Sequence, residues 1–122
     1  MKGALIVVGL AALSLVGCAK HSESCKKSVD LVAPFSDLGL PTGDGNGRVC
    51  EGDSKKIKVE HTGNDTASWT EKYGAAITGK GYTKKDCTKS QCVYVKDKAR
   101  LRVNVLDLKK WTTVIVEDYP EK

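Results

Sequence analysis

The sequence is poor in large aromatic side chains. Its 122 residues include one Phe, two Trp and four Tyr. A domain with so few aromatic rings offers little surface on which bases could stack, which argues against nucleic-acid binding. The net charge of +5 is only mildly basic. It fits contact with anionic lipid head groups or cell-wall polymers, but it also fits lysines that simply keep the surface soluble.

Sequence motifs of common enzyme classes are missing as well. No Gly-x-Ser-x-Gly elbow, phosphate loop or dinucleotide fingerprint occurs. His61 is the only histidine in the part of the chain that we expect to fold. It ends a predicted strand, where histidine is more often a surface or capping residue than a general base. We therefore expect no catalytic residue, no metal and no cofactor, and a small hydrolase using His61 is the last alternative.

The one long apolar run lies at the N-terminus. Lys2 precedes it, residues 4–16 are uncharged and almost wholly apolar, and the run ends in Leu15-Val16-Gly17-Cys18. This length suits the core of a signal peptide and falls short of the roughly 20 residues of a membrane-spanning helix. The pattern resembles the lipobox of bacterial lipoprotein signal peptides. An ordinary secretory peptide, or a membrane anchor that contains a cysteine, is the alternative.

The lipoprotein resemblance implies how the N-terminus is processed. Residues 1–17 would be cleaved off, the thiol of Cys18 would receive diacylglycerol, and its new amino group would often carry a further acyl chain such as palmitate. Two acyl chains suffice for stable membrane attachment. We therefore expect a lipid-anchored cell-envelope protein. In a Gram-negative host, Ala19 in place of a retention-favouring aspartate indicates the outer membrane, facing the periplasm.

After the signal peptide, the chain is long enough for one modest core. We assign residues 18–24 to a lipidated tether and residues 25–122 to a single α+β domain. The leading interpretation is a non-enzymatic binding or scaffolding module whose partner is an envelope protein or an anionic envelope polymer. The sequence does not indicate an oligomeric state.

Four cysteines follow Cys18, and an even number in a small exported domain indicates disulfides. Three pairings are open. The four residues between Cys87 and Cys92 suit a hairpin turn, so we favour this pair, which leaves Cys25 for Cys50. A zinc site is the alternative, but the spacings lack the usual Cys-x2-Cys pairs.

The segment 42–48 is a turn by composition, rich in residues that tolerate positive φ. It also resembles the second half of the Asp-x-Asp-x-Asp-Gly-x-x-Cys-Glu motif of excalibur calcium-binding domains, through Asp44, Asn46, Gly47, Cys50 and Glu51. The resemblance implies oxygen ligands around a glycine bend. Because Thr42 and Asn46 stand where the motif has aspartates, only a weak calcium site is expected, and it is the second interpretation.

Hydrophobic periodicity predicts the elements of the domain. A short helix within 25–33 ends at Pro34, and a second short turn holds Phe35 and Leu38. The regular elements that follow are a strand at 55–61, a helix at 65–79, and strands at 82–87, 92–96, 99–106 and 110–117. The expected architecture is a β-α-β-β-β core, an antiparallel meander with helices packed on one sheet face.

Alternation along the last three strands predicts which residues face the helices. The inward set is Val93, Val95, Leu101, Val103, Val105, Trp111, Thr113 and Ile115. The opposite face would meet solvent, and its mixture of cations and valines predicts a partner surface. That predicted surface consists of Lys96, Arg100, Arg102, Val114 and Val116. Alternatively, the aliphatic stems of the cations only cover the valines.

Overall fold

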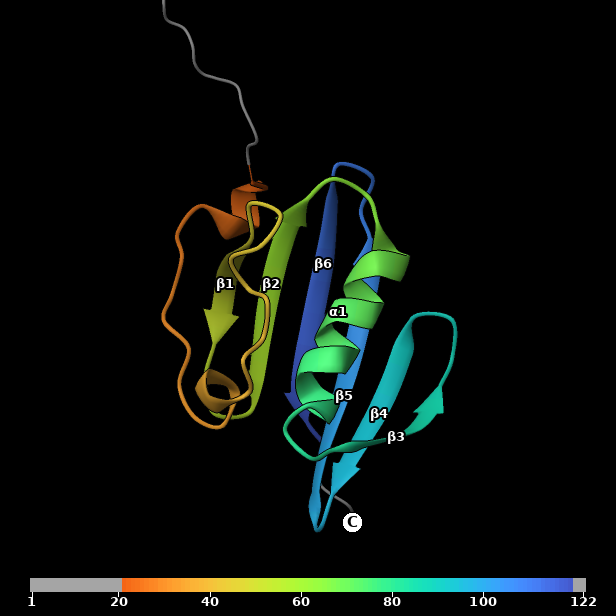
Figure 1. Cartoon of the computed structure of the whole chain (residues 1–122). Coiled ribbons are helices and arrows are strands. Elements are labelled where there is room, and N and C mark those ends of the chain that lie inside the picture. The colour runs from red at the N-terminus through yellow and green to blue at the C-terminus, as the bar shows by residue number, and fades with distance from the viewer. Residues whose placement is uncertain (1–20, 120–122) are drawn as a thin grey trace, which may run out of the picture.

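The computed structural model describes residues 21–119 and has an α+β fold, as predicted (Figure 1). A six-stranded antiparallel sheet with strand order β1-β2-β6-β5-β4-β3 carries one α-helix, α1, on one face. The elements are β1 (Arg48–Gly52), β2 (Lys56–Thr62), α1 (Thr66–Thr78), β3 (Thr83–Cys87), β4 (Gln91–Lys96), β5 (Ala99–Asp107) and β6 (Trp111–Asp118). The predicted signal peptide and Cys18 lie outside the described residues.

Helix α1 forms where its periodicity predicts it. Asp65 caps its first turn by accepting a hydrogen bond from the Ser68 backbone N–H at 3.1 Å. Trp69, Tyr73 and Ile77 follow at intervals of four residues and are all buried, so one face of the helix packs on the sheet.

Strand β1 is an addition to the predicted sheet. It pairs antiparallel with β2, and the register shifts between Val49 and Glu51. The turn that joins the two strands is fixed by the Asp53 carboxylate, which accepts hydrogen bonds from the backbone N–H groups of Lys55 and Lys56. The strand escaped prediction because it is only five residues long and its register irregularity breaks the alternation of side chains.

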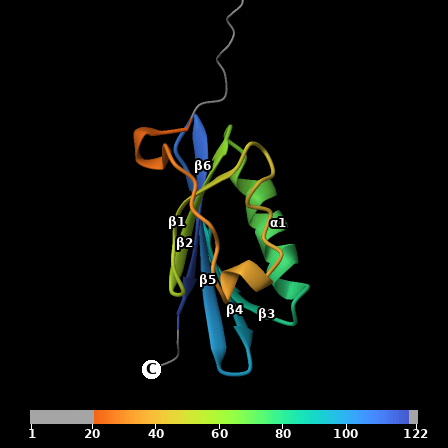
Figure 2. The same ribbon diagram turned by 90° about the vertical axis from the view of Figure 1, so that its left-hand side faces the viewer.

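The predicted helix within 25–33 is wrong. Two short 3-10 turns, η3 (Glu23–Cys25) and η4 (Phe35–Asp37), flank a non-helical stretch instead. Within that stretch the Val29 N–H donates to the carbonyl of Val49 in β1 at 2.9 Å, so its hydrogen bond goes to the sheet edge rather than to a helical turn. Figure 2 shows the segment starting on the face opposite α1 and passing round the β1 edge to the α1 side. There Phe35 is fully buried and Leu38 is only 5% exposed.

Side-chain orientation is predicted correctly for β5 and wrongly for β4 and β6. Cross-strand pairs share a face, and Val103 lies opposite Val116 while Leu101 lies opposite Tyr94. Tyr94, Val114 and Val116 therefore point toward α1 and are buried. The residues expected there from β4 and β6, namely Val93, Val95, Trp111, Thr113 and Ile115, belong to the opposite face. Both strands carry apolar residues at odd and even positions, so alternation alone cannot select a face.

Both predicted disulfides are confirmed. Cys25–Cys50 ties the N-terminal segment to β1, and Cys87–Cys92 closes the connection between β3 and β4.

Candidate functional site

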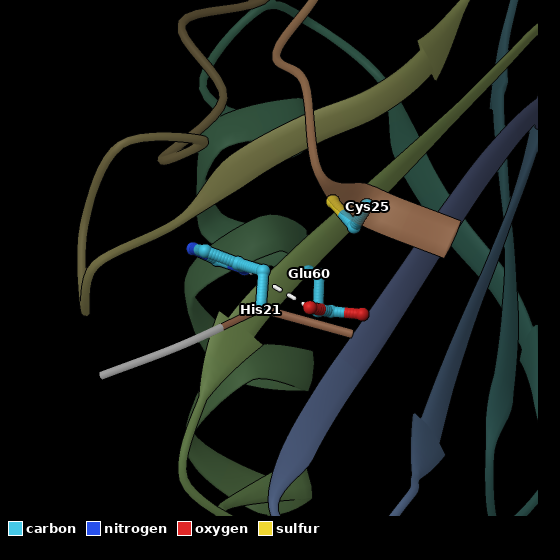
Figure 3. A group of neighbouring side chains, drawn as sticks. All are labelled: His21, Cys25 and Glu60. Carbon is cyan, nitrogen blue, oxygen red and sulfur yellow. Dashed lines mark hydrogen bonds and ion pairs between the residues drawn. The ribbon is translucent and has the colours of Figure 1, made fainter. Parts of the chain in front are cut away.

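The N-terminal segment is fastened to the sheet at Glu60. This β2 residue lies on the face opposite α1 and is only 1% exposed. Ser22 donates to both carboxylate oxygens, from its backbone N to Oε1 at 2.7 Å and from its Oγ to Oε2 at 2.5 Å. His21 places Nδ1 3.0 Å from Oε1 (Figure 3). A buried carboxylate is stable only with such partners, so burial of Glu60 and docking of His21 and Ser22 depend on each other.

Two further links hold the same segment. The Cys25–Cys50 disulfide joins it covalently to β1. The Arg48 guanidinium donates from Nη1 to the carbonyl oxygens of Cys25 at 3.1 Å and Lys26 at 2.5 Å. We call His21, Ser22, Glu60 and the Cys25–Cys50 disulfide the N-terminal clasp.

The clasp changes the extent of the tether. His21 and Ser22, which the sequence places in a tether spanning 18–24, are held against the sheet, and Glu23 and Ser24 enter η3. Only Ala19 and Lys20 separate Cys18 from the first residue of the clasp. The first described residue is therefore already bound to the sheet, three positions after the predicted lipid attachment site.

The clasp also contains the ligand types of a zinc site. Nδ1 of His21, Sγ of Cys25 and a carboxylate oxygen of Glu60 all lie within 4.8 Å of one another. Metal binding by cysteine requires a thiolate, however, and this sulfur is bonded to Cys50. The two remaining groups contact each other directly. With the disulfide formed, these three residues hold the N-terminal segment against the sheet.

His61 is fully buried rather than a surface residue. Nδ1 lies 2.7 Å from the carbonyl oxygen of Asp44, which can only accept, so this nitrogen carries the proton. Nε2 then accepts from the Tyr73 hydroxyl at 2.8 Å. Burial lowers the pKa of His61 and raises that of Tyr73, so both groups favour their neutral forms. With both ring nitrogens engaged, His61 has no atom available to act on a substrate.

The glycine-rich loop packs against this histidine and Trp69, and that packing explains Gly45 and Gly47. A Cβ on Gly45 would lie 2.5 Å from the Trp69 ring, and one on Gly47 would lie 2.1 Å from the Thr42 carbonyl oxygen and 2.7 Å from the His61 ring. The Asp44 carbonyl accepts a hydrogen bond from His61, and Asp44 and Asn46 are both exposed residues. Glu51 lies in β1 with its carboxylate 3.8 Å from the Lys58 ammonium. Within this resemblance, the Asp44 carbonyl, Gly47, Cys50 and Glu51 therefore each make a contact within the fold.

The five residues of the predicted partner surface do not lie together on one face of the sheet. Val114 and Val116 are fully buried beneath α1, so including them was wrong. Lys96 donates to the Lys80 carbonyl at 2.8 Å. Arg100 and Arg102, on the opposite face, both lie over the Tyr119 ring, and Arg102 also pairs with Glu117 at 3.1 Å. Of the predicted surface, the two arginines remain together as a half-buried cationic patch.

An open groove that the sequence did not predict lies between α1 and the β3–β4 pair. It has a volume of about 560 Å³, and Tyr94, Cys92, Glu71 and Lys84 are among the residues that line it. Gly74 is required here, because a Cβ would lie 2.5 Å from the Tyr94 hydroxyl oxygen. The small helix residues that complete the lining are Ala67, Thr70, Ala75 and Thr78.

Comparison of the chain with protein-family models, with curated proteins and with solved structures finds no match. Within residues 21–119, no helix has the length and apolar character needed to cross a membrane.

Proposed function

We propose that this protein is a lipid-anchored domain of the bacterial cell envelope, attached through Cys18, that binds another envelope component without catalysing a reaction. The observation that carries the proposal is the N-terminal clasp. It fixes the chain to the sheet at His21, three residues after Cys18. Three residues span at most about 10 Å, so a lipid on Cys18 would hold the domain directly at a membrane surface.

The cysteines support an exported location. Two disulfides in a domain of this size are typical of oxidising compartments and rare in the cytosol. Their pairing uses every cysteine after Cys18, so the chain offers one cysteine for acylation and four for stabilising the fold.

Arg100, Arg102 and Tyr119 form the surface that we propose for the partner. Both guanidinium groups stack over the Tyr119 ring on the face opposite α1, and Glu117 is paired with Arg102, so the patch carries a net positive charge of about one. Such a patch fits an anionic envelope polymer or an acidic region of an envelope protein.

Mass spectrometry of the full chain purified from bacterial membranes tests the anchoring. We expect cleavage after Gly17 and a diacylglycerol on Cys18. An unmodified Cys18 thiol in the membrane-extracted protein would contradict the proposal. A Cys18→Ser chain, which cannot be acylated, is the matched control.

Site-specific photocrosslinking in intact cells tests the partner surface. A photocrosslinking amino acid at position 102 should give a reproducible crosslinked product. The same amino acid at position 78 samples the groove beside α1, and at position 98 it samples the turn between β4 and β5. Crosslinked products at position 78 or 98, with none at position 102, would show that the partner binds elsewhere and would contradict the proposed surface.

A further inference from the structure

The turn between β5 and β6 exposes apolar side chains beside lysines. Leu106 is 38% exposed and Leu108 is 47% exposed. Lys109 and Lys110 follow, both exposed, and Trp111 begins β6. Leucine, lysine and tryptophan in one short segment is a composition typical of protein surfaces that sit at a membrane interface. We call residues 106–111 the β5–β6 turn; the name includes the last two residues of β5 and the first residue of β6.

The β5–β6 turn lies at the same end of the molecule as the start of the described chain. Trp111 pairs with Thr62, and two residues further along β6 Thr113 pairs with Glu60, the residue that holds His21. Figures 1 and 2 both show the turn and the beginning of the segment at one end, with the β4–β5 turn at the other. If Cys18 is acylated as proposed, the membrane that its lipid enters would lie at the end of the domain that carries this turn.

Hydrogen bonds hold the turn in one conformation. The Leu108 N–H donates to the Trp111 carbonyl at 2.9 Å, and the Lys109 N–H donates to the Asp107 carboxylate at 2.8 Å. The Lys110 carbonyl accepts from the Gly63 N–H at 2.8 Å, which ties the turn to the connection between β2 and α1. The leucines are thus presented by a rigid scaffold that needs no rearrangement on binding.

We infer that the β5–β6 turn is a second membrane contact, in which Leu106 and Leu108 enter the interface of the bilayer that carries the Cys18 lipid, while Lys109 and Lys110 meet anionic lipid phosphates. The inference rests on the proposed acylation of Cys18. Three residues from Cys18 to the clasp leave the domain within about 10 Å of the bilayer, which brings this end into contact. The turn then fixes the orientation of the domain and leaves the Arg100–Arg102 patch, which lies near the start of β5, for a partner.

Tryptophan fluorescence tests the contact. Trp69 is 5% exposed and stacked on His61, so membrane quenchers should act on Trp111. The acylated full chain is reconstituted into vesicles of phosphatidylethanolamine and phosphatidylglycerol with brominated acyl chains. We expect quenching relative to unbrominated vesicles, and a loss of at least half of that quenching in a Leu106→Asp, Leu108→Asp variant. Val32→Asp, an exposed apolar position whose carbonyl contacts η4, is the matched control and should quench like the natural chain.

The outcomes separate the inference from the proposed function. Acylated protein that stays with the vesicles but shows no bromine quenching overturns the membrane contact and leaves the anchoring intact. Equal quenching in the double Asp variant also overturns it. Mass spectrometry of the same sample reports acylation, and an unmodified Cys18 would overturn the anchoring and, with it, the inference. Brominated vesicles without phosphatidylglycerol test the role of Lys109 and Lys110, because they lack the anionic lipid. Quenching as strong as with phosphatidylglycerol would overturn that role.

Discussion

The ring of His61 lies flat against that of Trp69, with centroids 3.6 Å apart and planes inclined by 13°. The pair joins β2 to α1, and the glycine-rich loop closes over it. A Cβ on Gly45 would lie 2.5 Å from the Trp69 ring and one on Gly47 would lie 2.7 Å from the His61 ring, so the loop has no space for a side chain at either position. The loop therefore covers this edge of the core, and Gly45 and Gly47 stand where it comes closest to the rings.

Gly47→Ala tests this packing. The new Cβ would meet the Thr42 backbone oxygen, so the loop would have to move away from His61. We expect a loss of about 1 to 3 kcal/mol in the free energy of unfolding, measured by urea denaturation with the disulfides intact. Gly43→Ala is the control, since nothing lies within 4 Å of its Cβ position, and it should change stability by less than about 0.5 kcal/mol. Equal effects would show that the loop does not pack as described.

Burial of His61 predicts a dependence of stability on pH. Its pKa is lowered in the folded protein, chiefly because burial disfavours the charged ring, so the unfolded chain binds the proton more readily. The contribution is fully present above the unfolded pKa of about 6.5 and is lost as pH falls toward the lower folded pKa. Urea denaturation between pH 7.5 and 5.5 should show falling stability, and His61→Gln should flatten that slope. An unchanged slope in His61→Gln would contradict the assignment.

Glu60→Gln tests the N-terminal clasp. The amide keeps the size of the side chain but turns an N–H₂ group toward donors from Ser22, which leaves a buried donor unpaired. We expect a loss of about 1 to 3 kcal/mol and faster hydrogen exchange in residues 21–25. Glu51→Gln is the matched control, because its carboxylate is 55% exposed and only faces Lys58. It should cost less than about 1 kcal/mol and leave exchange near the N-terminus unchanged.

Two neighbouring threonines in β6 should respond in opposite ways to the same substitution. Oγ1 of Thr112 donates to the Gly63 carbonyl and accepts from the Asp65 N–H, so Thr112→Val should cost about 1 to 3 kcal/mol. Oγ1 of Thr113 is buried and has no hydrogen-bond partner within residues 21–119. Thr113→Val should therefore be neutral or stabilising. Thermal unfolding of both variants checks the difference, and a destabilised Thr113→Val would point to a partner for that hydroxyl.

Local signals account for the parts of the fold that were predicted. Helix α1 follows from the regular spacing of Trp69, Tyr73 and Ile77 after the Asp65 cap. Likewise, the short separation of Cys87 and Cys92 suits a closed turn, and the other disulfide follows once that pair is assigned. The signals for the helix and for the Cys87–Cys92 pair are each contained in a short stretch of chain, whereas Cys25–Cys50 was assigned by elimination.

The features that escaped prediction depend on contacts between distant residues. Glu60 is held by His21 and Ser22, 39 and 38 positions earlier, and nothing in its own neighbourhood marks it as buried. The burial of Val114 and Val116 depends on the register of β6 between β2 and β5. Alternating apolar residues cannot specify that register when both faces of a strand carry them.

The stretch of chain beside β1 limits how copies of this protein can join. A sheet with two open edges can grow without end, because each added copy offers a new edge. Here Val29 bonds to one outermost strand, and in the described chain the outer edge of β3 has no strand beside it. If two copies joined through the β3 edge, that edge would be closed on both, and the pair would have no second β3 edge to offer. At high local concentration, a sheet with one open edge can add one neighbour, whereas a sheet with two open edges can form a fibre.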